Sequence, residues 1–348
     1  MFIPFMRKSD MGFGGAAPRT PKLGIALGAG AARGWAHIGF LQEMQAQNLI
    51  PDIVTGTSIG AVCGGCYAAG KLDDLEHFAR ALNRKRIFSL MDFSWSGGGL
   101  LGGNRLRARL DTELGDIRTQ DIAIKFGAVA TEIGNGHEIW LTRGRIAEII
   151  HASYALPGLF EPVRLNGRWL MDGALVNPVP VTMCRAMGAD LVIAVNLSTD
   201  SLSRGYVLSD QPESEPEPNA PAPAAEILAE STTEPKGFLA AVSDGSFALP
   251  WPFRGATPGI KSGKKMMQAA APGIAAVMMD AFNIMQDRVA RSRLAGDPPD
   301  IMVNARVGKI GLFEFDRADE LIALGREAAR RSASDIRTAM QDLAERGF

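Results

Sequence analysis

The 348-residue sequence has no long apolar run, no excess of basic residues and no set of paired cysteines. Gly, Pro or charged residues interrupt its richest apolar stretches before about 18 residues, so we expect no membrane-spanning helix. Its 37 Lys and Arg residues balance 38 Asp and Glu residues, which gives no reason to expect a nucleic-acid partner. The N-terminal stretch has no apolar core preceded by basic residues and does not resemble a secretory signal, so we expect a cytoplasmic location.

Three cysteines are too few, and odd in number, for the disulfide framework of a small secreted fold. Cys63 and Cys66 form a CxxC pair, for which a redox or metal-binding role must be considered. No second CxxC and no HxxxH pair accompanies them, and they lie in a stretch of small residues, AVCGGCYAAG. The sequence therefore favours buried thiols that pack like small apolar side chains, and it predicts neither a metal nor a cofactor.

Strands and helices alternate from Leu23 onwards. The apolar run LGIAL (23–27) predicts a strand, GAGAARG (28–34) a Gly-rich loop, and WAHIGFLQEMQAQ (35–47) a helix. A second strand at 52–56 and a helix at 59–69 follow. This βαβα start is typical of an α/β protein with a mostly parallel sheet and helices on its faces. We expect further strands at 126–133, 137–142, 168–175, 189–197 and 300–307, and helices at 272–294 and 318–344.

The composition changes sharply at SDQPESEPEPNAPAPAAEILAESTTEP, residues 209–235, which contain seven acidic residues, six prolines and no base. Such a stretch cannot bury enough apolar surface to order itself. The predicted organisation is a tail (1–20), a main domain (21–198), a disordered acidic, Pro-rich insertion (199–270) and a C-terminal part that completes the main domain (271–348). Within the insertion, the aromatic residues and lysines of 237–265 are suited to peripheral contact with a membrane. A loop that docks on the main domain explains them equally well.

The loop GAGAARG can point several backbone N–H groups at a negative charge, and the following helix adds its positive dipole end. Two uses compete for it: binding the pyrophosphate of a dinucleotide, or stabilising an oxyanion. A dinucleotide loop has the pattern G-x-G-x-x-G and an acid at the end of the second strand. Here Gly34 comes one residue late after Gly28 and Gly30, and Asp52 precedes the second strand. The dinucleotide interpretation is therefore the weaker one.

GTSIG, residues 56–60, lies between a predicted strand and a predicted helix, as the nucleophile turn of a serine hydrolase does. A plain helix N-cap by Thr57 or Ser58 explains this stretch alone equally well. Hydrolases with this turn usually carry a histidine after the acid, but no histidine follows Asp172. An arrangement without histidine is possible if a carboxylate is hydrogen-bonded directly to the serine and takes its proton. Asp172, in RWLMDGALVNPVP, is the best candidate because it should lie at a strand end, although an Asp that opens a turn before Gly is common.

GAGAARG, GTSIG and DGA, in this order, resemble the motifs of the patatin-like phospholipase family. ASYALPGLFEPV (152–163), LLGGNRLRARL (100–110) and ELIALGREAA (320–329) are also similar to segments of bacterial members. The resemblance extends over about 21–198 and from about 272 to the end. It implies a three-layer α/β/α sandwich with a mostly parallel central sheet.

The resemblance further implies that Ser58 is a nucleophile, that Asp172 is its general base, and that the oxyanion is bound by Gly30, Ala31 and Arg33. The supporting motif glycines are Gly28, Gly34, Gly56, Gly60 and Gly173. The family often has glycine where this chain has Ala29 and Ala31, so an alanine that needs a positive φ there would be strained. The implied reaction is hydrolysis of a fatty-acyl ester of a phospholipid or lysophospholipid through an acyl-enzyme, without a metal or cofactor.

Two other classes of function stay open at this point. A nucleotide-binding protein would use the same Gly-rich loop for phosphate. A non-catalytic scaffold of the same fold would use its acidic insertion to recruit a basic partner.

Overall fold

The computed structural model describes residues 20–83, 104–197 and 274–346. The acidic insertion, the proposed lipid-contact segment at 237–265 and all but the last residue of the N-terminal tail lie outside these ranges. The predicted division of the chain therefore stays a prediction. The chain forms two compact units, Met1–Leu202 with Phe282–Phe348, and Ser203–Ala281. Of the second unit, only the beginning of one helix, from Ile274, is described.

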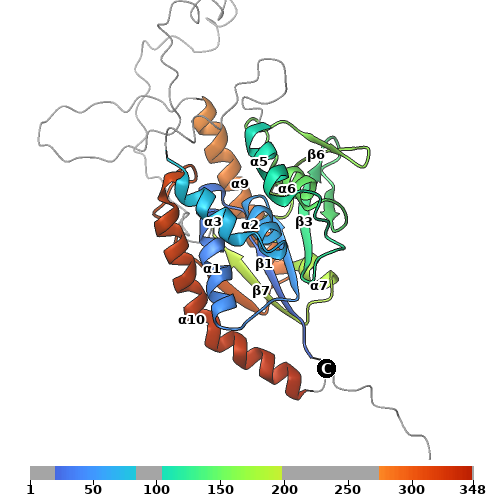
Figure 1. Ribbon diagram of the computed structural model, residues 1–348. Coiled ribbons are helices and arrows are strands. Elements are labelled where there is room, and N and C mark those ends of the chain that lie inside the picture. Colours follow the sequence, from blue (N-terminus) through green and yellow to red (C-terminus); the bar gives the residue numbers. More distant parts are fainter. Residues whose placement is uncertain (1–19, 84–103, 198–273, 347–348) are drawn as a thin grey trace, which may run out of the picture. The chain divides into compact units, whose positions relative to one another are not determined.

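A mixed, mostly parallel sheet forms the centre of the first unit (Figure 1). The strand order is β5-β6-β3-β2-β1-β7-β8, and β4 also pairs with β3. The pairs among β1, β2, β3, β7 and β8 are parallel, whereas β4, β5 and β6 pair antiparallel. The α/β fold class expected from the sequence is confirmed. The strands are β1 Leu23–Leu27, β2 Ile53–Thr57, β3 Lys125–Glu132, β4 Glu138–Leu141, β5 Val163–Leu165, β6 Arg168–Asp172, β7 Leu191–Asn196 and β8 Ile301–Asn304.

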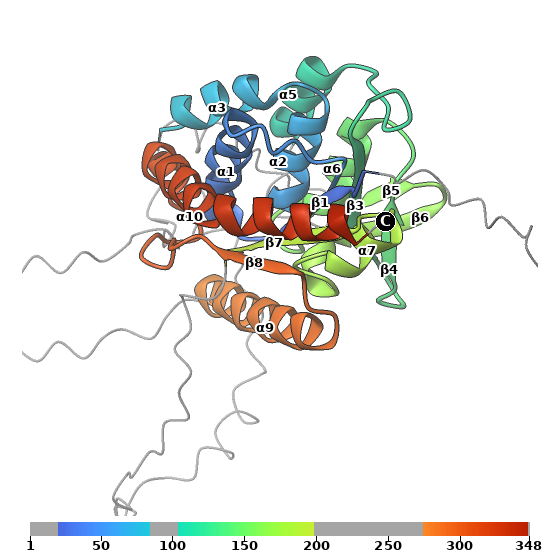
Figure 2. The same cartoon turned by 90° about the horizontal axis from the view of Figure 1, so that it is seen from below.

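Helices cover both faces of the sheet because successive strand side chains point to opposite faces. Leu23, Ile25 and Leu27 of β1 belong to the larger core, whereas Ala26 belongs to a smaller core on the other face. Figure 2 shows α9 on the opposite side of the sheet from α1 and α2. On the larger core lie α1 Trp35–Ala46, α2 Ile59–Ala68, α3 Leu72–Ala81, α5 Asn104–Leu114, α6 Ile146–Tyr154 and α10 Ala318–Glu345; on the smaller lie α7 Val181–Ala186 and α9 Ile274–Gly296.

The sequence predicted every strand except β5 and the helices α1, α2, α9 and α10, but it predicted no helix at the positions of α3, α5, α6 and α7. The strand expected at 168–175 ends at Asp172, because the side chain of Asp172 caps the 3₁₀ turn η2, Gly173–Leu175. The strand expected at 300–307 ends at Asn304. The three-residue strand β5 was not predicted at all. It joins β6 through Asn166 and Gly167, both with positive φ, which suits a tight hairpin.

β2 and β6 lie end to end along one edge of β3. β4 pairs with Ala128–Thr131 in continuous antiparallel register and so occupies the other edge. β2 runs parallel to β3 as far as Thr57, which lies opposite Val129. β6 runs antiparallel and ends at Asp172, opposite Ala130. The carboxyl ends of two strands that are far apart in sequence therefore meet at adjacent positions of β3.

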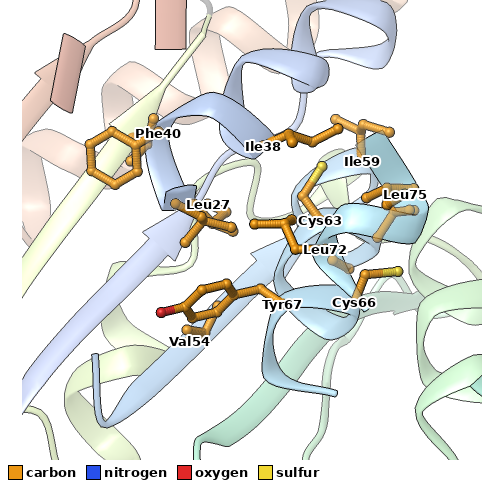
Figure 3. Packing of buried hydrophobic residues seen from close by; sticks show 14 of the residues in the cluster. Leu27, Ile38, Phe40, Val54, Ile59, Cys63, Cys66, Tyr67, Leu72 and Leu75 are labelled. Atoms are coloured by element: carbon orange, nitrogen blue, oxygen red, sulfur yellow. The ribbon is translucent and has the colours of Figure 1, made fainter. Parts of the chain in front are cut away.

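The CxxC cysteines are packing residues. All three cysteines are buried and free, and Figure 3 shows Cys63 and Cys66 among apolar side chains of the larger core. The Cys63 thiol lies 3.4 Å from Gly34 O. Burial raises the pKa of Cys66 to about 12, which disfavours the thiolate needed for redox chemistry or metal binding. The sequence-based interpretation of buried, apolar-like thiols is confirmed.

The long helix α10 packs directly on α1 through two glycines. A Cβ atom added at Gly39 of α1 would overlap Ile322 O, and one at Gly325 of α10 would overlap Ala36 O. The two backbones are therefore in contact without intervening side chains. Because α1 directly follows the Gly-rich loop, this contact also fixes the helix that carries the loop.

We expect Gly325→Ala to lower the free energy of unfolding by about 1–3 kcal/mol, because the new methyl group forces α10 away from α1. Gly296→Ala is the matched control, since a Cβ there meets no atom within 4 Å. Urea denaturation measures both changes. Equal stability of the Gly325→Ala variant and the native chain would contradict the close packing.

Candidate active site

The Gly-rich loop, Ser58 and Asp172 meet at the carboxyl edge of the sheet. The Gly-rich loop follows β1, Ser58 follows β2, and Asp172 is the last residue of β6. Ligand sites of open α/β sheets collect at this edge. The end-to-end meeting of β2 and β6 brings Ser58 and Asp172 together although 114 residues separate them.

Ser58 occupies a strained turn between β2 and α2. Its φ of 58° and ψ of −122° are rare for a residue with a side chain. The turn is tight because α2 begins directly above the sheet: a Cβ at Gly56 would lie 2.5 Å from Ala61 N, and one at Gly60 would lie 2.8 Å from Gly28 O. Ser58 makes no side-chain capping bond to α2. The helix-cap interpretation of GTSIG is therefore wrong for the Ser58 hydroxyl.

The Ser58 hydroxyl instead donates a hydrogen bond to Asp172 Oδ2 at 2.6 Å. Asp172 is only 1% exposed, and its Oδ1 accepts the Ala174 N–H at 2.8 Å. Burial raises the pKa of Asp172 to about 7, against the opposing effect of the hydrogen bonds from Ser58 and Ala174. A carboxylate with this pKa is a much better proton acceptor at neutral pH than an exposed aspartate.

Two buried hydroxyls that the sequence did not single out hold this pair in place. Ser153 Oγ accepts the Ser58 N–H at 3.0 Å and donates to Val129 O at 2.7 Å. Thr131 Oγ1 donates to Asp172 O at 2.8 Å. Ser153 lies in ASYALPG, which resembles family members, and this likeness was the one available signal. A serine or threonine in a helix or strand carries no pattern of its own.

Two backbone amides of the Gly-rich loop donate no hydrogen bond to another described residue. Gly28 N donates to Val195 O, Ala29 N to Pro178 O, and Ala32 N to Leu312 O. Among the hydrogen bonds of the described residues, none is donated by the N–H of Gly30 or Ala31. These are two of the positions that the resemblance assigned to oxyanion binding.

Ala31 has a φ of 47°, so the strain expected for an alanine in this loop is present. A non-glycine residue in this region costs about 1–2 kcal/mol. The 3₁₀ turn η1, Ala31–Gly34, begins there and leads directly into α1. The loop is therefore held in a conformation that alanine does not favour by itself.

The segment before α10 holds the loop from outside. Leu312 O accepts the Ala32 N–H at 2.9 Å, and Ile310 O accepts Arg33 Nε at 2.7 Å. Burial lowers the pKa of Arg33, and the charge of Glu314 opposes this shift. Nε of Arg33 thus donates to the backbone carbonyl of Ile310, in the segment before α10, a contact that the sequence did not predict.

The histidines have structural roles or lie on the surface. His37 Nε2 donates to Gly28 O at 2.7 Å, and burial lowers the pKa of His37 to about 4, so the ring stays neutral. Burial also lowers the pKa of His151 to about 4. The centre of its ring lies 5.3 Å from the centre of the Tyr154 ring. His77 and His137 are exposed. Within the described residues, none of the four histidines hydrogen-bonds to Ser58 or Asp172, in agreement with a serine that is bonded directly to a carboxylate.

The dinucleotide alternative finds little support in the loop. Asp52, the acid nearest in sequence to a ribose-binding position, accepts the Leu23 N–H at 2.8 Å at the start of β1. Asp52 therefore lies at the amino end of the sheet, whereas the Gly-rich loop lies at the carboxyl end. Across the described ranges, no group of three or more His, Cys, Asp or Glu side chains is placed to hold a metal ion.

The fold and the geometry of this edge are those of an α/β protein with a serine at a strand–turn–helix elbow. The family model of patatin-like phospholipases matches residues 25–185, which include the Gly-rich loop, Ser58 and Asp172. Relatives that match far more of the chain are named NTE family proteins. The chain belongs to the patatin-like phospholipase family.

Three similar proteins illustrate the extent of the likeness. An uncharacterized NTE family protein of Mycobacterium tuberculosis is 31% identical over 339 residues, which cover 90% of this chain and 91% of that protein. Lysophospholipase NTE1 of Saccharomyces cerevisiae is 32% identical over 182 residues, which cover 51% of this chain but only 11% of the yeast protein. The crystal structure of VipD from Legionella pneumophila matches 53% of this chain with a TM-score of 0.41 and 16% identity.

None of the helices within the described residues is both long and apolar enough to cross a membrane.

We expect Ser58→Gly to be more stable than Ser58→Ala by about 1 kcal/mol, because glycine adopts the φ of 58° without steric cost. Both variants lose the hydroxyl, so their difference isolates the backbone strain. Guanidinium denaturation of the two variants measures it. If the alanine variant is the more stable one, the strained turn is not present in solution.

Proposed function

We propose that this protein hydrolyses fatty-acyl esters of phospholipids or lysophospholipids, with Ser58 as nucleophile and Asp172 as general base. The observation that carries the proposal is the 2.6 Å hydrogen bond from the Ser58 hydroxyl to the buried Asp172 carboxylate. This bond joins the proton acceptor that the chemistry requires to a half-buried serine held in a strained turn. Membership of the patatin-like phospholipase family supports the class of substrate.

The first half of the reaction forms an acyl-enzyme. Ser58 Oγ attacks the carbonyl carbon of the ester while its proton passes to Asp172 Oδ2. The carbonyl oxygen becomes an oxyanion in the tetrahedral intermediate. When this intermediate collapses, the bond to the alcohol oxygen breaks, and the proton on Asp172 passes to the leaving alcohol.

The second half releases the fatty acid. Asp172, again ionised, takes a proton from a water molecule as that water attacks the acyl carbon. The second tetrahedral intermediate collapses, the Ser58 oxygen leaves with the proton from Asp172, and the hydrogen bond between the two side chains forms again. The carboxylate thus performs both proton transfers, so the absence of a histidine after Asp172 in the chain is no obstacle.

The N–H groups of Gly30 and Ala31 are the proposed oxyanion donors. Both are free of acceptors among the described residues, and both belong to a loop held on two sides. Donors fixed before the reaction stabilise developing charge without reorganisation, and one such donor typically contributes about 3–4 kcal/mol. Arg33 follows in the same turn, where its positive charge lies close in sequence to the proposed donors.

The names of relatives favour lysophospholipids among the candidate esters. Several fungal relatives are named lysophospholipases, although they share only about half of this chain. The single acyl chain of a lysophospholipid presents its ester without the need to leave a bilayer. We propose this class as the first to test.

We expect Ser58→Ala and Asp172→Asn each to lower kcat/KM for a lysophospholipid by at least about 10⁴-fold, because each removes a group that acts in both half-reactions. Ser334→Ala and Asp335→Asn are matched controls on the exposed side of α10 and should keep full activity. A fluorophosphonate probe should label the native chain and the controls but not Ser58→Ala. Full turnover by either site variant rules out the proposed pair.

We expect kcat/KM to rise with pH and to level off above about pH 7, because only the ionised form of Asp172 accepts the Ser58 proton. The stability should change in the opposite direction. The pKa of Asp172 is raised on folding, so protonation favours the folded state, and the free energy of unfolding should fall as the pH rises from about 4 to about 7.

The Asp172→Asn variant separates this effect from all other titrating groups. Its stability between pH 4 and 7 should lack the part of the decrease that Asp172 causes in the native chain. Urea denaturation at several pH values measures the difference between the two proteins. Parallel stability profiles, or an activity limb near pH 4, would show that Asp172 titrates as an ordinary carboxyl group.

A further inference from the structure

Two large apolar side chains are exposed on β6 and at the end of β3, near Asp172. Ile133, directly after β3, is 41% exposed, and Trp169 of β6 is 52% exposed. The Ile133 N–H donates to Trp169 O at 2.9 Å, so the two residues continue the pairing of β3 with β6. Paired residues of neighbouring strands point to the same face. Ile133 and Trp169 therefore form one exposed apolar patch.

A positive charge lies on the same patch. Arg164 of β5 pairs with Trp169 in the β5–β6 register, and its guanidinium carbon lies 5.9 Å from the centre of the indole ring. Arg164 is exposed and makes no ion pair with another described residue. We refer to Ile133, Trp169 and Arg164 as the tip cluster.

The tip cluster lies just beyond the candidate active site. Asp172 pairs with Ala130, and Ile133 is three residues further along β3, a distance of about 10 Å at the rise of a strand. Trp169 is likewise three residues from Asp172, so its side chain points to the opposite face of β6. A flat surface that contacts the tip would therefore lie about 10 Å from Asp172 along the strands, on the face opposite the Asp172 side chain.

We propose that the tip cluster docks on the surface of a phospholipid bilayer, so that the acyl ester of a bound lipid comes within reach of Ser58. This inference rests on the proposed function for its biological sense. Indole rings favour the boundary between water and hydrocarbon, and a cation beside them matches the negative phosphates at that depth. The tip offers this combination at the edge where the sheet presents its loops.

A second copy of the chain fits the tip cluster less well. Even a fully buried aromatic side chain contributes only about 150–250 Å². Two side chains that are about half exposed therefore provide far less than the roughly 1,000 Å² of a specific protein interface. A bilayer needs no matching shape and accepts a small apolar tip.

The test uses the full chain with Ser58→Ala, so that the vesicles are not consumed. We expect the added pair Ile133→Ser and Trp169→Ser to lower the partition onto vesicles of phosphatidylcholine and phosphatidylglycerol by about tenfold or more. Arg164→Gln should weaken binding to these vesicles about fivefold and should change binding to pure phosphatidylcholine little. Co-sedimentation measures the bound fraction, and thermal unfolding confirms that each variant is folded.

The same substitutions elsewhere serve as the matched control. Ile50, 47% exposed, precedes β2 at the amino end of the sheet. Trp140, 41% exposed, pairs with Val129, about 13 Å from Ile133 along β3. The pair Ile50→Ser and Trp140→Ser should keep vesicle binding within about twofold. The proposal is overturned if the tip variant binds vesicles as well as the parent chain does, or if the control variant loses as much vesicle binding as the tip variant.

Two further measurements separate this proposal from competing explanations. If light scattering shows a dimer that the tip substitutions convert to a monomer, a second copy covers the cluster and the proposal is wrong. With Ser58 intact, the tip variant should keep its activity on a water-soluble short-chain ester and lose activity on vesicle lipid. If the tip variant loses activity on neither substrate, the docking surface is rejected and the proposed function stays intact. Tip-dependent vesicle binding without hydrolysis of any ester supports the docking surface and rejects the proposed function.

Discussion

The hydrogen bond between the Ser58 hydroxyl and the Asp172 carboxylate is the interaction on which the proposed chemistry depends. In water an aspartate is too weak a base to accept a serine proton, since its pKa is about 3.9. Here burial raises the pKa of Asp172 to about 7. The bond to Ser58 and the Ala174 N–H keep the ionised form accessible. In the proposed mechanism, a buried carboxylate takes the role that histidine has in a Ser-His-Asp triad.

Most other features of the edge bring these two groups together and hold them. β2 and β6 meet end to end along β3, which places Thr57 and Asp172 at adjacent register positions. Gly56 in β2 and Gly60 at the start of α2 let that helix lie against the sheet, with Ser58 in the strained turn between them. The hydroxyl of Ser153 then fixes the Ser58 backbone. Strain in the turn is stable because the core on both sides is closely packed.

Sequence reasoning worked where a residue's role depends on its neighbours in the chain. The run LGIAL and the small-residue stretch after GTSIG predicted β1 and α2 because periodicity and glycine spacing are local. It failed where partners come from elsewhere. Ser153 carries no pattern, the contact of Arg33 with Ile310 O joins residues 277 apart, and β5 is too short to alternate. The end of β6 was misplaced because the Asp172 side chain, and not a turn motif, stops the strand.

The sequence by itself determined the class of fold, the Gly-rich loop, the serine turn and the pair of residues worth testing, because each rests on short-range pattern or on family likeness. The tertiary structure decided the rest. Only the folded sheet shows that the Ser58 hydroxyl reaches Asp172, that Gly30 and Ala31 donate no backbone hydrogen bond to another described residue, and that burial raises the pKa of Asp172. Burial, strand register and pKa are properties of the packed chain, since they depend on atoms that no local stretch contains.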